Sequence, residues 1–256
     1  MNIISVTDIT KTYTERKLFE KASFYLQERE KVGVIGINGT GKSTLLKIAA
    51  GIEEPDEGQV IRANHIVVRY LPQNPVFDPE LSVIDTVLAQ SSQNFVGGTS
   101  EQNQNAGNHA EHVEHWNLES DAKAMMTKLG ITNFEQKAGE LSGGQRKRLA
   151  LVAALLVPCD VLILDEPNSY VDKRFESHFY KLLDEINKES AIILVSHDIG
   201  TVLAMVKNIA CVNETLHYHP GADVSEEWLG EKYACPIELI GHGDLPHRVL
   251  KKHEHE

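Results

Sequence analysis

The stretch GINGTGKST, residues 36–44, combines glycines, a lysine and hydroxyl side chains at a spacing that suits phosphate chemistry. Glycines let backbone amides curl around phosphate oxygens, the lysine adds positive charge at the terminal phosphates, and the serine hydroxyl can ligate Mg²⁺. An ordinary glycine-rich turn is the alternative, but the stretch lies between a strand pattern and a helix pattern, where a phosphate loop is expected. The predicted phosphate contacts are Gly36, Asn38, Gly39, Thr40, Gly41, Lys42, Ser43 and Thr44.

A second chemical feature is the apolar run 161–164, which ends in the adjacent carboxylates Asp165 and Glu166. In a protein with a phosphate loop, the aspartate at such a strand end is expected to supply a second Mg²⁺ contact beside Ser43. Glu166 would then lie near the terminal phosphate, where its carboxylate can polarise an attacking water molecule. A buried strand that simply reaches solvent is the alternative, and the phosphate loop weighs against it.

Three further polar positions come at the ends of predicted elements. Gln73 closes YLPQ and is expected to reach the metal or the water, and His197 in LVSHD is placed to hydrogen-bond the terminal phosphate. LSGGQ precedes a helix, and its backbone amides form a helix N-terminus suited to anions. A surface strand end, a structural histidine and a capped helix start are the alternatives, although a cap does not require two glycines. The predicted residues of this helix start are Ser142, Gly143, Gly144 and Gln145.

Alternating strands and helices must position these residues. The first 30 residues alternate apolar and polar side chains, which predicts short half-buried strands. Later patterns predict strands within 65–73, at 161–164 and within 191–196. Helices are predicted after the phosphate loop, around 118–131, from residue 143 and around 175–188. Strands that alternate with helices indicate a largely parallel α/β sheet with helices on both faces.

The composition indicates a globular protein that crosses no membrane. Apolar residues make up 41% of the chain, and the longest apolar run, 149–157, is far below the roughly 20 residues of a membrane span. The N-terminus lacks the pattern of a secretory signal, and the three cysteines have no paired spacing, so we expect a cytoplasmic protein with reduced thiols. The net charge of −12 disfavours free nucleic acid as the main partner, because polyanion binding depends on clustered lysine and arginine.

In this order and at these spacings, the phosphate loop, the glutamine of YLPQ, LSGGQ, the LILDE strand and the histidine of LVSHD resemble the nucleotide-binding cassette of ABC ATPases. The resemblance covers nearly the whole chain. It implies an α/β P-loop cassette with a RecA-like parallel-sheet core, an N-terminal antiparallel β-subdomain and a helical signature subdomain. By this resemblance, residues 1–220 form the cassette, with a helical and loop insertion at about 80–150, and residues 221–256 form a C-terminal tail.

The resemblance also implies how ATP and Mg²⁺ are bound. Cassettes of this family form head-to-tail dimers, here a homodimer, in which ATP lies between the phosphate loop of one copy and LSGGQ of the other. The adenine would stack on an aromatic side chain upstream of the phosphate loop; Tyr13 is the candidate, and an ordinary strand tyrosine is the alternative. Asp172 matches the aspartate that crosses the dimer interface, while Asn168 departs from the usual threonine. Expected metal contacts are Ser43, Gln73 and Asp165.

Two branches of the family share the resemblance. Up to about Pro167, stretches such as KLFEKASFYLQEREKVGVIGINGTGKSTLLKIAAG and ELSGGQRKRLALVAALL are similar to ABC-F proteins, which act on ribosomes. From about Asn168 onward, NSYVDKRFESHFYKLLDEINKESAIILVSHD and CPIELIGHGDLPHRVLKKHEHE resemble ATP-binding subunits of zinc or manganese transporters. This change within the chain raises the hypothesis of a recombined or designed sequence.

Three functions remain in competition. The favoured one is the energising subunit of a divalent-metal transporter, docked on a membrane permease at the inner face of the cell membrane. It is favoured because the chain has one cassette, an acidic balance and a transporter-like C-terminal part. The second is a soluble ATPase acting on the ribosome, although ABC-F proteins carry two cassettes and a charged helical arm. The third is an ATPase coupled to neither partner.

Polar and histidine-rich segments complete the predictions. Residues 91–109 are rich in Gly, Asn and Gln and are predicted to form a mobile loop. Histidines three residues apart at the end of this loop are candidates for weak Zn²⁺ or Ni²⁺ binding, with a solvated loop flank as the alternative. Further histidine pairs are candidates for metal sensing or delivery, with solvent exposure as the alternative. These histidines are His109, His112 and His115, then His217 and His219, and in the tail His253 and His255.

Overall fold

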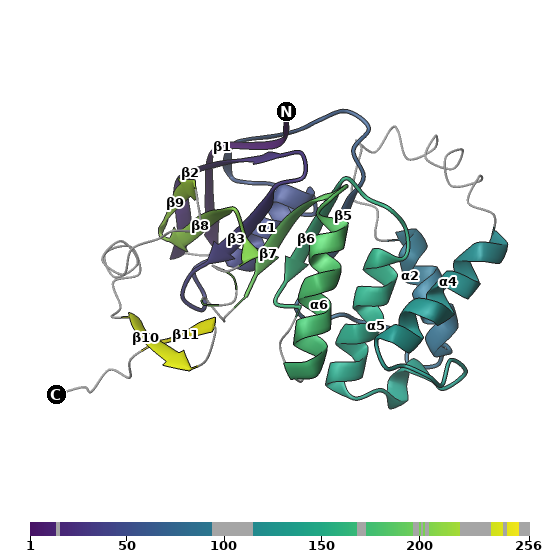
Figure 1. Ribbon diagram of the computed structural model, residues 1–256. Coiled ribbons are helices and arrows are strands. Elements are labelled where there is room, and N and C mark those ends of the chain that lie inside the picture. Colours follow the sequence, from purple (N-terminus) through teal and green to yellow (C-terminus); the bar gives the residue numbers. More distant parts are fainter. Residues whose placement is uncertain are drawn as a thin grey trace. The chain divides into compact units, whose positions relative to one another are not determined.

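Figure 1 shows the fold in a computed structural model of the chain. The described residues are 1–13, 16–93, 115–167, 173–196, 200, 202, 205–220, 237–242 and 245–250. They belong to two compact units, one formed by Met1–Ala63 with Asn187–Glu256 and the other by Asn64–Ile186. Among the described residues, no helix combines the length and the apolar character that crossing a bilayer requires.

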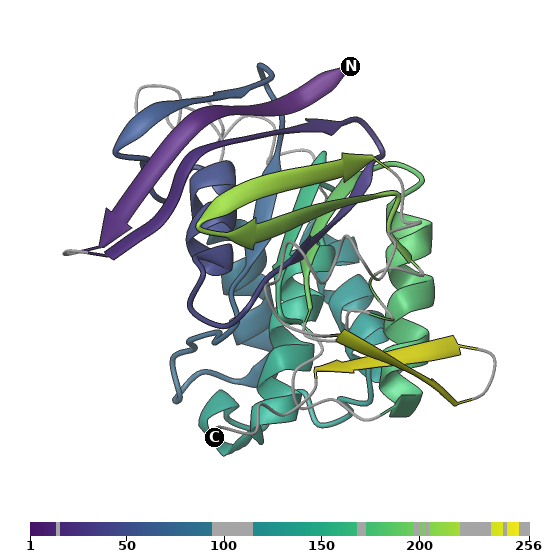
Figure 2. The ribbon, with the colours of Figure 1, turned by 90° about the vertical axis from the view of Figure 1, so that its left-hand side faces the viewer.

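An antiparallel sheet begins the first unit and consists of β1 (Asn2–Tyr13), β2 (Arg16–Gln27) and β4 (Glu57–Arg62), in the order β2-β1-β4 (Figure 2). Both β1 and β2 have 12 residues, so the strands are longer than the short ones predicted. Register shifts interrupt their pairing, and Asp8 and Lys21 have left-handed φ values of 50° and 48°. Such bulges let a strand bend and continue pairing beyond an irregular residue.

The second sheet of this unit is mainly parallel. Strand β3 (Lys31–Ile35) pairs in parallel with β7 (Ala191–Val195) and with β8 (Asn208–Asn213), and β9 (Thr215–Pro220) adds to β8 in antiparallel fashion. Every residue of β3 and β7 is buried, as expected for central parallel strands. A separate hairpin joins β10 (Ile237–His242) to β11 (Leu245–Leu250). The predicted α/β fold with a parallel sheet and an N-terminal antiparallel sheet is confirmed.

Helix α1 (Lys42–Ala50) follows β3 and is held at its C-terminal end. Its apolar residues Leu45, Leu46 and Ile48 are fully buried. At its C-terminus, Arg62 of β4 donates from Nε to the carbonyl of Ala49 at 2.9 Å and from Nη2 to that of Ile48 at 2.6 Å. A cation bonded to the last carbonyls stabilises a helix end. The helix that bears Lys42 at its N-terminus is therefore anchored at its opposite end.

The described part of the second unit combines a parallel strand pair with the helices α2, α4, α5 and α6. Strand β5 (Val68–Leu71) pairs with β6 (Val161–Asp165), and helices α2 (Val83–Gln93), α4 (His115–Lys128) and α5 (Gly143–Leu155) lie side by side in Figure 1. A short 3₁₀ turn, Ala138–Glu140, precedes α5, and α6 (Lys173–Ile186) follows β6. Residues 91–93 belong to α2 rather than to the predicted loop, and the remainder of that loop lies outside the described residues.

A buried arginine connects the strand pair to the helices of the second unit. Arg69 of β5 is completely buried. Its Nη2 donates to the carbonyl of Ser91 in α2 at 2.9 Å, and its Nη1 lies 3.4 Å from the carbonyl of Ala153 in α5. A buried guanidinium requires such acceptors because its desolvation is costly. Arg69 thus fixes β5, and the glutamine that follows it, relative to α2 and α5.

Candidate functional site

The phosphate loop lies between β3 and α1, as the sequence predicts. Two of its positions require glycine, each for a different structural reason. A Cβ on Gly36 would lie 2.4 Å from the carbonyl oxygen of Val212, so the loop approaches β8 too closely for a side chain. Gly41 precedes the helix with a left-handed φ of 97°, which glycine adopts at little cost. Because Gly41 offers no side-chain cap, the first amides of α1 form a helix N-terminus of the kind that suits an anion.

Lys42 is folded into this loop. Its side chain is buried, and Nζ donates to the carbonyls of Gly36 at 2.8 Å and Ile37 at 3.1 Å. The Thr40 hydroxyl donates to the carbonyl of Ile37 at 2.9 Å. Ser43 is half-buried in the first turn of α1, while Asn38 is exposed. The lysine therefore closes the loop internally and places a positive charge beside the helix N-terminus.

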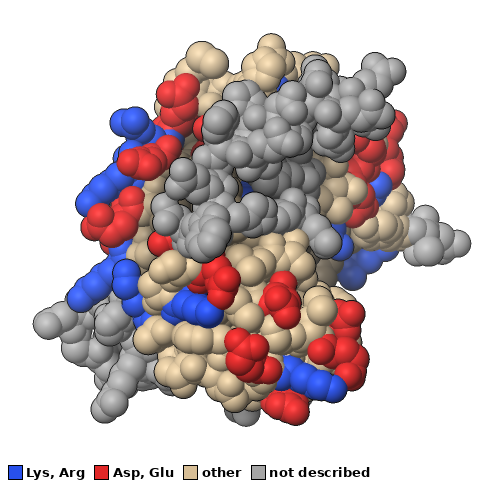
Figure 3. Space-filling view, turned by 90° about the vertical axis from the view of Figure 1, so that its right-hand side faces the viewer, with Lys and Arg blue, Asp and Glu red and all other residues tan. Residues whose placement is uncertain are grey.

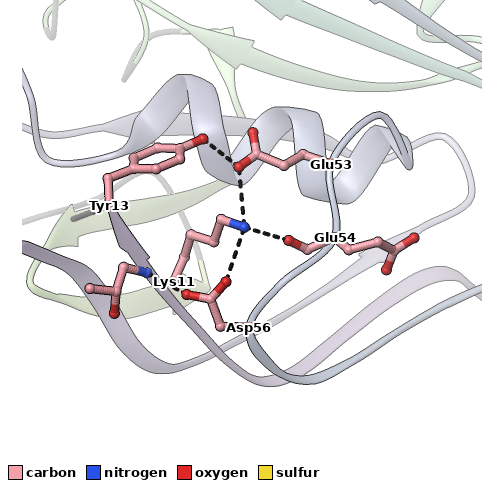
Figure 4. A network of polar contacts seen from close by, with 6 residues as sticks. Lys11, Tyr13, Glu53, Glu54 and Asp56 are labelled. Carbon is pink, nitrogen blue, oxygen red and sulfur yellow. Dashed lines mark hydrogen bonds and ion pairs between the residues drawn. The ribbon is translucent and has the colours of Figure 1, made fainter.

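Tyr13 belongs to a polar network at the end of β1, shown in Figure 4. Its hydroxyl donates to the carboxylate of Glu53, and this hydrogen bond, followed by partial burial, raises the pKa of Tyr13, whereas a hydrogen bond with Thr44 opposes the rise. Lys11 Nζ lies 5.7 Å from the centre of the Tyr13 ring and pairs with Glu53 at 3.3 Å and Asp56 at 3.1 Å. Tyr13 is 46% exposed, so the network fixes an aromatic residue that a planar ligand can reach.

In the second unit, the register of two parallel strands brings the predicted carboxylates and glutamine together. Tyr70 is opposite Ile163 and Leu71 is opposite Leu164, so the residues after β5 lie beside those after β6. Gln73 Nε2 donates to Glu166 Oε2 at 2.5 Å. Asp165 and Glu166 are both buried, and Glu166 has a left-handed φ of 50°. A non-glycine residue in this conformation carries a strain of about 1 kcal/mol or more, which is typical of functional sites.

Tyr70 is a member of this cluster that the sequence did not single out. Its hydroxyl donates to Asp165 Oδ2 at 3.1 Å. Burial, and then the charge and hydrogen bond of Asp165, raise the pKa of Tyr70 well above its usual value. The tyrosine therefore remains a neutral donor that orients the aspartate. The sequence signal for this contact is weak, because an aromatic residue in an apolar strand normally indicates only core packing.

Lys147 is a second residue that the sequence did not single out. It lies in α5, is buried, and donates from Nζ to the backbone carbonyl of Glu166 at 3.3 Å. The available signal was its helical spacing: Lys147 is three and four residues before Ala150 and Leu151, which are both buried. A lysine in line with apolar residues at that spacing is placed on the buried face of its helix.

The LSGGQ segment starts α5 with a capping box. The Ser142 hydroxyl accepts from the amide of Gln145 at 3.3 Å, and Gln145 Oε1 accepts from the amide of Ser142 at 3.0 Å. The cap thus accounts for the serine and the glutamine. It does not account for Gly143, because a Cβ there would meet nothing within 4 Å. Any steric need for glycine at this position must come from outside the described part of the chain.

Several predicted residues lie outside the described part of the chain. These are the catalytic candidate His197, the interface candidate Asp172, and the histidines His109, His112, His253 and His255. The side chain of His115 is also not described, whereas His217 and His219 lie on β9 and the His217 ring is 2.9 Å from the Thr215 hydroxyl. Among the described residues, no group of three or more histidine, cysteine or carboxylate side chains is arranged to hold a metal ion.

The family model described as ABC transporter matches residues 19–169, more than half of the chain. Among solved structures, a dimeric ATP-binding cassette in a post-hydrolysis state, bound to ADP and phosphate, is 22% identical. It superposes with a TM-score of 0.70 over 85% of this chain and 98% of its own. At this identity, the likeness establishes the fold.

Relatives come from both branches that the sequence suggested. A "Probable metal transport system ATP-binding protein" of Thermotoga maritima is 33% identical, covering 86% of this chain and 85% of its own. The uncharacterized ABC transporter ATP-binding protein YfmR of Bacillus subtilis is 32% identical over 77% of this chain, which spans 34% of that relative's length. ABC transporter F family member 5 of Arabidopsis thaliana is 30% identical, covering 83% of this chain and 28% of its own. The chain belongs to the ABC transporter family of ATP-binding cassettes.

Proposed function

We propose that this protein is a Mg²⁺-dependent ATPase that energises a divalent-metal ABC transporter from the inner face of the cell membrane. The observation that carries the ATPase assignment is the pairing of buried Glu166 with Gln73 at the ends of two parallel strands. A carboxylate that is buried, oriented and next to a second carboxylate is suited to polarise water. The assignment of residues 1–220 to the cassette and 221–256 to a tail belongs to this proposal.

Each part of the proposed site has a separate role. Lys42 and the loop amides hold the phosphates, and Glu166 with Gln73 orients the attacking water.

The proposed Mg²⁺ site draws on Ser43, Gln73 and Asp165, which provide the hard oxygen atoms that Mg²⁺ prefers. The hydrogen bond from the Tyr70 hydroxyl fixes the Asp165 carboxylate. Held by Ser43, Gln73 and Asp165, Mg²⁺ would supply positive charge that offsets the negative charge of the phosphates. His197 is proposed to hold the terminal phosphate. Catalysis then depends on positioning and charge stabilisation.

The proposed homodimer is supported by the start of α5. Within the described part of the chain, no atom lies within 4 Å of a Cβ built on Gly143, and Ser142 and Gly143 are exposed. A nucleotide held by a second copy can approach these helix amides closely only if no side chain intervenes. We therefore propose that Ser142–Gln145 complete the ATP site of the other copy, with Asp172 at the same interface.

The metal-transport assignment rests on the Thermotoga maritima relative, whose similarity extends over 85% of its length. A ribosome-associated ATPase is the second candidate, favoured by the Arabidopsis thaliana relative and by the ABC-F resemblance of residues 1–167. Binding to ribosomal RNA would draw on clustered lysine and arginine. On the face shown in Figure 3, the described basic and acidic side chains are interspersed, and the net charge is −12. These charges weigh against ribosomal RNA as the main partner.

A co-purification experiment tests the choice of partner. The Glu166→Gln variant, loaded with ATP and Mg²⁺, is used as bait in a lysate with solubilised membranes, and Lys42→Met, which is expected to bind ATP much more weakly, serves as the control at an ATP concentration that saturates only the first variant. We expect a polytopic membrane protein to co-purify with the first variant and not with the second. Ribosomal subunits in its place would assign the chain to the ribosome. Recovery of neither would contradict both partners and leave an uncoupled ATPase.

Tyr13 gives a prediction about nucleotide affinity. Tyr13→Ala is expected to raise the Kd for ATP about tenfold, because stacking of a base on an aromatic ring contributes about 1–3 kcal/mol. The matched control is Tyr25→Ala, since Tyr25 is 45% exposed and Tyr13 is 46% exposed. Titration with a fluorescent ATP analogue measures both. Equal affinities of the two variants would show that Tyr13 is only a strand tyrosine.

A further inference from the structure

Lys147 is an unusual residue in the interior of the second unit. Lysine is rarely fully buried unless it is paired, yet this side chain is only 8% exposed. Its neighbours along the same face of α5, Ala150 and Leu151, are each 2% exposed. Apolar side chains at this position would pack without a desolvation cost. An electrostatic interaction must therefore compensate for the burial of the Lys147 amine.

That reason is the carboxylate cluster at the end of β6. Lys147 Nζ donates to the backbone carbonyl of Glu166 at 3.3 Å. Burial lowers the pKa of Lys147, while the charges of Glu166 and Asp165 oppose this fall. The ammonium is thus attracted by both carboxylates and bonded to the backbone of the one proposed as the base. Interactions of this type are stronger in a buried site than in water.

Glu166 needs such support because its backbone conformation is unfavourable. Its φ of 50° is left-handed, and Pro167 follows it, although a residue before proline normally prefers an extended conformation. A strained residue keeps its conformation only when surrounding contacts hold it. Gln73 holds the carboxylate, at 2.5 Å from Oε2, and Lys147 holds the carbonyl. The two contacts fix both ends of the residue.

We propose that Lys147 is a positioning residue that fixes the backbone of Glu166 and makes its orientation depend on α5. The inference rests on the proposed role of Glu166 in ATP hydrolysis. Helix α5 begins at Gly143, directly after its cap at Ser142, and Lys147 is in its second turn. A helix moves as a stiff rod over such a distance. A ligand that binds the LSGGQ end of α5 and shifts the helix would therefore also shift Lys147, and with it the Glu166 backbone of the same chain.

The first test separates catalysis from binding. Lys147→Gln and Lys147→Met are expected to lower kcat for ATP hydrolysis about tenfold, because small displacements of catalytic groups have effects of this size or larger. The Kd for ATP is expected to stay within about twofold, since the phosphate loop is unchanged. Lys147→Arg is expected to restore most of the rate because it retains a buried cation and donor. Rates are normalised to the measured ATP-binding stoichiometry, so partial unfolding does not imitate a loss of kcat.

Arg146→Gln is the matched control, because Arg146 is the neighbouring cation on α5 but is exposed. Its Nη2 donates to the carbonyl of Gly139 at 3.0 Å, away from Glu166. We expect its kcat to remain close to that of the unsubstituted protein. If Arg146→Gln lowered kcat as much as Lys147→Gln, a general effect of helix charge would explain the result and the proposal would be wrong.

A double-mutant cycle provides the second test. In the Glu166→Gln background, Lys147→Gln is expected to produce less than a twofold further loss in the single-turnover rate, because the residue it positions has already been disabled. A further tenfold loss would show that Lys147 acts independently of Glu166 and would overturn the inference. If Glu166→Gln alone left the rate unchanged, the proposed function itself would fail. If Glu166→Gln hydrolysed ATP slowly while Lys147→Gln hydrolysed it at the unsubstituted rate, the inference about Lys147 would be rejected and the proposed function would stand.

Discussion

Glu166→Gln is expected to lower kcat for ATP hydrolysis by a factor on the order of 100 or more while ATP still binds. Glutamine has nearly the same shape as glutamate but cannot polarise water or accept its proton, and general base catalysis contributes about 10²–10⁴-fold. Because the side chain is only 6% exposed and bonded to Gln73, the shape-conserving substitution is expected to preserve the surrounding structure. Phosphate release under saturating ATP and Mg²⁺ measures the effect.

Glu57→Gln is the control for Glu166→Gln, because it removes the same charge from an exposed position on β4. Its kcat is expected to match that of the unsubstituted protein. Turnover by Glu166→Gln within a few-fold of this control would refute Glu166 as the base. The pair of variants thus distinguishes a specific catalytic role from a change in net charge.

Lys42→Met is expected to raise the Kd for ATP by a factor on the order of 100. The ammonium supplies the positive charge of the phosphate loop, and charge-assisted contacts are roughly twice as strong as neutral ones. The substitution also removes the bonds from Nζ to the carbonyls of Gly36 and Ile37, which loosens the loop that would surround the phosphates. Both effects weaken binding rather than the chemical step.

Equilibrium titration with ATP measures this loss, and Lys47→Met is its control on the same helix. Lys47 is half-buried in the last turn of α1, away from the phosphate loop. We expect its affinity for ATP to remain nearly unchanged. An unaltered affinity of Lys42→Met would contradict the assignment of residues 36–44 as the phosphate loop, whatever the result with Glu166.

The elements that carry strong local patterns were predictable from the sequence. The wholly apolar segments 161–164 and 191–195 form buried parallel strands, since their composition suits only a sheet covered on both faces. The glycines of residues 36–44 signalled a loop with special backbone requirements, and Gly36 and Gly41 meet them. The capped helix start of LSGGQ was predictable because Ser142 and Gln145 are only three residues apart, whereas no local contact explains Gly143.

Contacts between distant residues were not predictable in the same way. Tyr70 reaches Asp165, and Lys147 reaches Glu166, only because of the register of β5 against β6 and the rotation of α5 about its axis. Neither quantity follows from a local pattern. The hydrogen bond between Tyr13 and Glu53 similarly depends on the bend after α1. The long pairing of β1 with β2 was underestimated because bulges at Asp8 and Lys21 interrupt the apolar alternation.

We propose that two copies close around ATP before Glu166 acts. The most direct measurement is the molar mass of the Glu166→Gln variant by light scattering, with ATP and Mg²⁺ and then with ADP. We expect twice the monomer mass of 28.5 kDa with ATP, one bound nucleotide per chain, and the monomer mass with ADP. A monomer that remains monomeric while saturated with ATP would contradict it.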